Sequence, residues 1–241
     1  MDAMILRGET CYDVSVQFRV DVSVSIDWIR RRGDLISVPT PYDPTHVATA
    51  TWDTLSNYCK EVRALGMRIQ ELISESLGLE KEYINNVLGE QGQHMAVNYY
   101  PPCPEPELTY GLPGHTDPNA LTILLQDLHV SGLQVLKDDK WLAVKPHPNA
   151  FVINIGDQLQ ALSNGIYKSV WHRAIVNTEK PRLSVASFLC PCNDALISPA
   201  KPLTEDENGA VYRGFTYAEY YKTFWSRDLL KEHCLELFKN K

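Results

Sequence analysis

Apolar and polar residues alternate strictly near the start of the chain, between residues 11 and 28. Tyr12 and every second residue through Trp28 are apolar, and the residues between them are polar or charged. A period of two over about seventeen residues predicts one long, half-buried strand, longer than most strands in globular proteins. The arginines at positions 30–32 and Gly33 mark its expected end, and a proline-containing loop follows over residues 39–44.

The spacing of apolar residues then changes from that of a strand to that of a helix. Between residues 54 and 77, apolar side chains recur with the three- and four-residue spacing of an amphipathic helix. Asp53 is the expected N-cap of this helix, and Gly78 lies just beyond its expected end. A shorter helix is predicted over residues 80–88, before Gly89. We expect both helices to support the fold and to carry no chemistry.

After residue 91 the sequence favours β-structure. Short apolar segments recur at nearly regular spacing and are separated by proline, glycine and asparagine, which is typical of a β-sandwich or barrel. The tail from Thr216 to Phe238 is rich in aromatic and leucine residues and predicts one or two helices on the outside of the domain. The predicted strands are 94–100, 121–126, 133–136, 141–144, 151–155, 170–177 and 183–189. The expected fold is therefore mainly β with flanking helices.

Composition narrows the function classes. The 241 residues suffice for one substantial core, and a formal net charge of −7 argues against a nucleic acid partner. No apolar run reaches membrane-spanning length, and residues 1–10 lack the apolar core of a secretory signal. Six scattered cysteines have no zinc-type spacing and are expected to be free thiols in a cytoplasmic protein.

Three residues have the chemistry of a metal site. His115 and Asp117 are two positions apart, so on an extended backbone their side chains point to one face, and His172 lies in a later predicted strand. Two imidazoles and one carboxylate are the ligands of non-haem Fe(II) sites with open coordination positions. A histidine and an aspartate at this spacing also occur by chance as surface residues, so the pair alone is a weak signal.

Arg182 and Ser184 strengthen this hypothesis. They fall on one face of the strand after His172, and a guanidinium with a hydroxyl suits the carboxylate of a small acid. The competing interpretation of Arg182 is a salt bridge on an edge strand. Of the remaining histidines, His94 fits a packed core position, whereas residues 46, 129 and 233 have no partner in the sequence and are expected on the surface.

Several motifs resemble the plant Fe(II)- and 2-oxoglutarate-dependent dioxygenases, in particular the downy mildew resistance oxygenases, which include salicylate hydroxylases, and the flavone synthase I enzymes. The resemblance begins at about Trp52 and continues to the C-terminus. The motifs are Asn98-Tyr-Tyr-Pro-Pro-Cys103, His115-Thr-Asp117, Asn154-Ile-Gly-Asp157, Leu162-Ser-Asn-Gly165, His172-Arg173 and Arg182-Leu-Ser184.

The resemblance implies a double-stranded β-helix (jelly roll) core that uses Fe(II), 2-oxoglutarate and O₂, with ascorbate supporting activity. The protein would be a monomer that hydroxylates or desaturates a small aromatic substrate and releases succinate and CO₂. By the same resemblance His115, Asp117 and His172 hold iron, and Phe188 stacks on the substrate. The residues implied to bind 2-oxoglutarate are Arg182, Ser184, Tyr100 and Asn98.

The segment before residue 52 departs from the family pattern, in which a βα unit supports the main sheet. Residues 1–51 are therefore expected to be an atypical segment, followed by supporting helices (52–90), the oxygenase core (91–193) and a C-terminal loop with helices (194–241). Either the first segment is adventitious, as in a shortened chain, or its strand replaces an edge of the sheet. We favour the first interpretation because so long an alternating strand without a partner would leave an exposed edge.

Three functional alternatives remain open. The chain could oxidise another substrate, such as a gibberellin or alkaloid precursor. It could be a truncated, catalytically weak relative that binds metal and acts as an interaction protein. A zinc-containing or cupin-like protein without oxygenase activity could use the same metal ligands, although it would have no need of a dicarboxylate-binding arginine.

Overall fold

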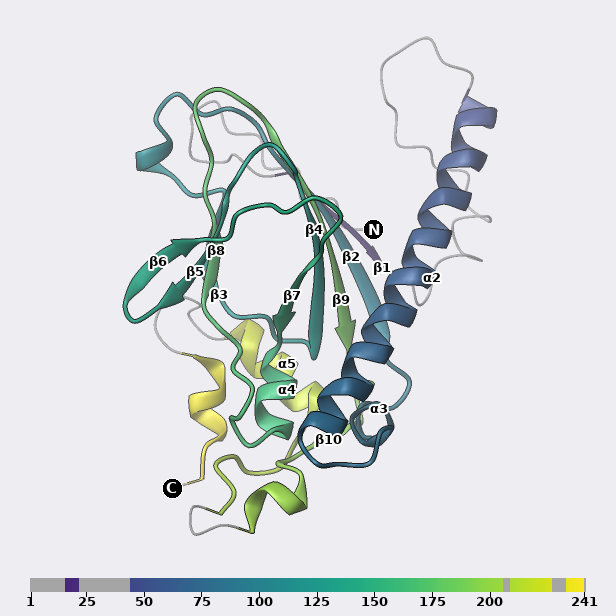
Figure 1. The fold of residues 1–241 in the computed structure, drawn as a ribbon, viewed down its shortest axis with the longest axis vertical. Coiled ribbons are helices and arrows are strands. Elements are labelled where there is room, and N and C mark those ends of the chain that lie inside the picture. Colours follow the sequence, from purple (N-terminus) through teal and green to yellow (C-terminus); the bar gives the residue numbers. More distant parts are fainter. Residues whose placement is uncertain (1–15, 22–43, 206–208, 227–232, 241) are drawn as a thin grey trace.

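A computed structural model describes residues 16–21, 44–205, 209–226 and 233–240 (Figure 1). The helices are α2 (Pro44–Ser76), α3 (Tyr83–Leu88), α4 (Asp157–Leu162) and α5 (Tyr217–Ser226), with short 3₁₀ segments η1 (Pro106–Leu108), η2 (Lys201–Thr204) and η3 (Cys234–Phe238). The strands are β1 (Val16–Asp21), β2 (Gly92–Tyr100), β3 (Leu112–His115), β4 (Leu121–Gln126), β5 (Leu133–Lys137), β6 (Lys140–Ala143), β7 (Val152–Ile155), β8 (His172–Ala174), β9 (Arg182–Cys190), β10 (Leu196–Ile197) and β11 (Phe215–Thr216).

Two antiparallel sheets form the centre of the domain. The large sheet has the strand order β1-β2-β9-β4-β7, and the small sheet has the order β3-β8-β5-β6. The sheets face each other in Figure 1, and a buried cluster of Leu124, Ala186 and Leu133 joins the inner face of the large sheet to β5 of the small one. This arrangement confirms the predicted double-stranded β-helix core.

Helix α2 covers the outer face of the large sheet. Its apolar stripe includes the buried Val62 and Ile73. Gly66 faces β9, and a Cβ added there would lie 2.2 Å from Cδ1 of Leu189, so a side chain at this position would require Leu189 to move. No helix within the described ranges combines the length and apolar character needed to cross a membrane.

The C-terminal segment packs closely against the main apolar core. Tyr220 is fully buried, and Phe224 and Phe238 join the same apolar cluster as Ile123 and Leu189 of the large sheet. Burial of each such side chain stabilises the fold by roughly 1.5–3 kcal/mol. Helix α5 and the 3₁₀ segment η3 lie within the range predicted to form helices that pack on the domain.

Two expectations about the first third of the chain also change. Of the predicted strand over residues 11–28, the structure describes residues 16–21 as β1, which pairs antiparallel with β2; the remainder lies outside the described residues. The strand therefore has a partner, which favours the interpretation that it forms an edge of the sheet. Helix α2 begins at Pro44, so Asp53 is an exposed residue inside the helix and not its N-cap.

Candidate metal centre

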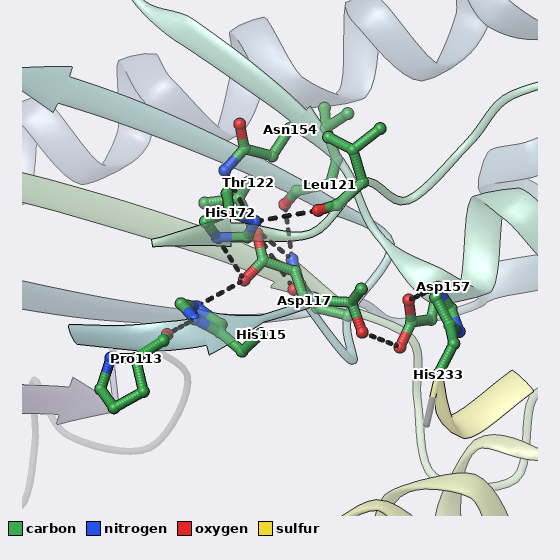
Figure 2. A network of polar contacts seen from close by, with 12 residues as sticks. Pro113, His115, Asp117, Leu121, Thr122, Asn154, Asp157, His172 and His233 are labelled. Atoms are coloured by element: carbon green, nitrogen blue, oxygen red, sulfur yellow. Dashed lines mark hydrogen bonds and ion pairs between the residues drawn. The ribbon is translucent and has the colours of Figure 1, made fainter. Parts of the chain in front are cut away.

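His115, Asp117 and His172 converge at one end of the space between the two sheets. His115 ends β3, His172 begins β8, and the two residues are direct partners in the small sheet. Asp117 lies two residues beyond β3, and its Oδ1 is 3.8 Å from Nε2 of His115 and 3.6 Å from Nε2 of His172. One ligand atom from each residue lies within 4.8 Å of the others, a spacing that one cation can bridge (Figure 2).

Backbone carbonyls fix both imidazole rings. Nδ1 of His115 hydrogen-bonds the carbonyl oxygen of Pro113 at 2.9 Å, and Nδ1 of His172 hydrogen-bonds that of Val170 at 3.1 Å. Each Nδ1 therefore carries the proton, and each Nε2 is left to bind a metal. Burial in the site, with the neighbouring ring of His172, lowers the pKa of His115 to about 4, so this imidazole is neutral at physiological pH.

The two carboxylate oxygens of Asp117 have different partners. Oδ2 accepts a 2.8 Å hydrogen bond from Oγ1 of Thr122 and a 3.4 Å one from Nδ2 of Asn154. Thr122 is itself held by Asn119, whose Nδ2 donates to its hydroxyl at 3.1 Å. Oδ1 faces the two histidines, so the geometry assigns Oδ1 to a metal and Oδ2 to the protein.

A second polar group lies at the other end of the inner face of the large sheet. Arg182 is 2% exposed and is the direct partner of Tyr100, whose ring centroid lies 5.4 Å from the guanidinium carbon. Its Nη2 donates to Oε1 of Gln126 at 3.4 Å, and its Nε has no partner. Burial lowers the pKa of Arg182, against the opposing influence of Tyr100 and Asp127. Among the described residues, no carboxylate forms an ion pair with this buried cation.

The strand register places further buried polar side chains beside Arg182, and we call this set of residues the anion-binding group. Ser184 of β9 lies between Asn98 of β2 and Gln126 of β4, and all three are buried. The Oδ1 atom of Asn98 has no hydrogen-bond partner within the described structure. A buried guanidinium without a carboxylate, beside a serine hydroxyl, fits the carboxylate of a small acid.

The next rows of the same face lead from this group to the metal centre. Ala96, Ala186 and Leu124 form an apolar row with two short side chains. Phe188 follows, beside Thr122, whose hydroxyl contacts Asp117. Phe188 is partly buried and therefore borders the metal end of the face. His94 is the partner of Phe188 on β2, so it also faces this space.

Asp157 is a buried carboxylate that sequence reasoning did not select. It is fully buried, and its Oδ2 accepts hydrogen bonds from the hydroxyls of Tyr220 at 2.5 Å and Thr116 at 3.2 Å. Nε2 of His233 lies 3.4 Å from its Oδ1, so the expectation that His233 is a surface group was wrong. Burial raises the pKa of Asp157, and the contacts with His233, Ser169 and Tyr220 oppose that rise.

Comparison with known proteins identifies relatives of this arrangement. The model of the 2OG-Fe(II) oxygenase superfamily matches residues 91–191. Protein DOWNY MILDEW RESISTANCE 6 of Arabidopsis thaliana is 74% identical over 191 residues, which are 78% of this chain and 56% of that protein. Flavanone 3-dioxygenase 2 of Oryza sativa subsp. japonica is 69% identical over 187 residues, which are 78% of this chain and 55% of that protein.

A solved structure shares the architecture. The crystal structure of JOX2 in complex with 2OG, Fe and JA aligns with a TM-score of 0.80 and 36% identity, over 95% of this chain and 65% of that one. The chain spans about half the length of the curated relatives it matches, since the alignments cover 56% and 55% of them.

Proposed function

The chain belongs to the 2OG-Fe(II) oxygenase superfamily, and on this premise we propose that it uses Fe(II) and 2-oxoglutarate to oxidise a small aromatic molecule, with release of succinate and CO₂. One observation carries the proposal. The space between the two sheets has a metal-binding triad at one end, formed by the small sheet and a loop, and at the other end a buried arginine of the large sheet that no carboxylate of the described residues neutralises. A hydrolytic metal site would have no use for such a cation.

Different residues would hold the metal, bind the cosubstrate and exclude water. His115, Asp117 and His172 would hold iron, which when bound supplies the redox chemistry with dioxygen that side chains lack. Arg182 and Ser184 would donate to the distal carboxylate of 2-oxoglutarate, helped by Tyr100 and Asn98. The apolar row of Ala96, Ala186 and Leu124 leaves room for the carbon chain and keeps water away from it.

An aromatic substrate is supported by Phe188. Its ring is partly buried next to Thr122, which hydrogen-bonds the metal ligand Asp117, so it borders the place where a substrate must present its reacting bond. Aromatic rings favour offset-stacked or edge-to-face partners at such positions. A flavanone dioxygenase among the relatives points to the same substrate class.

Succinate release tests the proposal. The purified chain with Fe(II), ascorbate and 2-oxoglutarate is expected to form succinate faster when salicylate or naringenin is added. His172→Ala should abolish this release, because it removes a metal ligand. His129→Ala is the matched control, since His129 is exposed and away from the triad, and it should retain full activity. No succinate above the protein-free control would refute the oxygenase function, whereas release that neither aromatic stimulates would refute only the substrate class.

A further inference from the structure

The loop that carries Asp117 depends on a second segment for its shape. This metal-ligand loop, residues 116–120, contains no helix or strand, and four of its successive carbonyl oxygens accept hydrogen bonds from residues 156–158, which we call the cradle. The bonds run from Asp157 N to Asp117 O (2.8 Å), from Gln158 Nε2 to Pro118 O (2.8 Å), from Gln158 N to Asn119 O (3.3 Å) and from Gly156 N to Ala120 O (2.8 Å). The position of the metal ligand is therefore set by the position of the cradle.

The contact between loop and cradle is too close for any other residue at position 156. A Cβ added to Gly156 would lie 2.0 Å from the carbonyl oxygen of Asn119. The φ angle of Gly156 is −91°, which any residue can adopt, so glycine is required here by the approach of the two backbones and not by conformation. A shift of the cradle would move the loop directly.

The cradle is held in turn by the C-terminal segment. The carboxylate of Asp157 accepts a hydrogen bond from Thr116 of the metal-ligand loop and another from Tyr220 of α5, and it lies beside His233. Figure 2 shows Asp157 and His233 beside the loop, on the side away from His115. One buried carboxylate thus connects the loop with two residues that follow it by about a hundred positions in the chain.

We propose that Asp157, braced by Tyr220 and His233, is a positioning residue for the metal ligand Asp117. The inference rests on the proposed metal site. A ligand that must keep one oxygen on the metal needs a support whose own side chains are fixed by packing and hydrogen bonds. The cradle supplies the backbone donors, and the C-terminal contacts keep those donors in place. The C-terminal segment therefore contributes to metal affinity although none of its described residues lies in the triad.

Two tyrosine variants separate this role from ordinary stabilisation. Tyr220→Phe removes the hydroxyl that bonds Asp157. Tyr212→Phe is the matched control, because Tyr212 is also buried and its hydroxyl also bonds α4, at Gln160, but it makes no contact with the cradle. Tyr220→Phe loses the buried hydrogen bond to Asp157 and Tyr212→Phe the one to Gln160, so the Tm of each should fall by a few degrees, about 2–4 °C. Metal affinity should distinguish them.

Cobalt is the probe, since Co(II) accepts the same ligands and its visible absorption reports on coordination geometry. Tyr220→Phe is expected to raise the Kd for Co(II) about 10-fold and to change the absorption bands, whereas Tyr212→Phe should change the Kd less than about 2-fold. Equal changes in both variants, or none in Tyr220→Phe, would overturn the positioning role. If the unaltered chain bound no Co(II), the proposed metal site would fail, and this inference with it.

A second pair guards against a folding defect in the C-terminal segment. Thr116→Val removes the hydroxyl that bonds Asp157 at almost constant shape, and Thr116→Ser retains it. We expect Val to weaken Co(II) binding about 10-fold and Ser to keep it within about 2-fold, with thermal unfolding recorded for both. Identical affinities for the two variants would contradict the proposal.

Discussion

Replacing Arg182 by methionine should separate cosubstrate binding from stability. Arg182 is 2% exposed and no carboxylate of the described residues pairs with it, so in the absence of ligand its burial is not offset by an ion pair. A methionine of similar length removes that unpaired charge. The Tm of the ligand-free Arg182→Met variant is therefore expected to stay the same or rise.

The affinity for 2-oxoglutarate should fall steeply in the same variant. A bidentate guanidinium–carboxylate contact contains two charge-assisted hydrogen bonds, each contributing about 1.5–3 kcal/mol. Their loss, about 3–6 kcal/mol, corresponds to a Kd higher by about 10²–10⁴-fold. Ser184 and Tyr100 remain and can still donate to the carboxylate, so the lower part of this range is the expected result.

Calorimetric titration of the Co(II)-loaded protein provides the measurement, with 2-oxopentanoate as the reference ligand because it lacks the distal carboxylate. Arg182→Met should bind 2-oxopentanoate almost as well as the unaltered chain does. Arg173→Met is the matched control, since Arg173 stacks on the ring of Trp141 at 4.2 Å on the opposite face of β8 and should not affect either ligand. An equal loss of affinity for both 2-oxo acids would refute the assignment of Arg182 to the distal carboxylate.

Two further predictions concern the proposed metal ligands Asp117 and His115. Thr122→Val removes the 2.8 Å hydrogen bond to Oδ2 of Asp117 and should raise the Kd for Co(II) about 10-fold in a competitive titration; an unchanged Kd would show that Asn154 alone suffices. The pKa of His115 is lowered to about 4 from 6.5, so between these pH values the unfolded chain binds a proton that the folded chain does not. The stability of the metal-free protein should therefore decrease as pH falls from about 6.5 to about 4, and denaturant unfolding of His115→Gln should show a shallower slope there; an identical slope would exclude this cause.

The fold was predictable where an apolar segment was clearly bounded. Strand β4 has the predicted bounds because its residues are mostly apolar, although they do not alternate: Leu121 and Ile123 face α2, and Thr122 faces the metal end. Helix α4 was missed because all six of its residues are buried, so it shows no amphipathic period. Strand β3 is absent from the predicted strands, since it contains Pro113 and Gly114; it is an edge strand of the small sheet, where proline is tolerated.

The candidate site likewise contains residues that could be identified from the sequence and contacts that could not. His115, Asp117, His172 and Arg182 could be selected because their residue types and spacing are unusual in β-structure. The acceptors of the two histidines could not be named, although both are backbone carbonyls only two residues earlier in the chain. The contact between Asp157 and the distant His233 has no local signal at all, because only the tertiary fold brings them together.

Strand β9 fixes the distance between the anion-binding group and the aromatic ring of Phe188. It lies inside the large sheet, paired on both sides, and it carries Arg182, Ser184 and Phe188 on a single face. At about 3.3 Å per residue, the four steps from Ser184 to Phe188 set a distance of about 13 Å along the strand between the anion-binding group and the aromatic ring. Inserting one residue between Ser184 and Phe188 would turn one of the two side chains away from the site. Inserting two residues would lengthen the distance between them by about 7 Å. The residue count of this one strand therefore sets how far the ring of Phe188 lies from the buried arginine and serine.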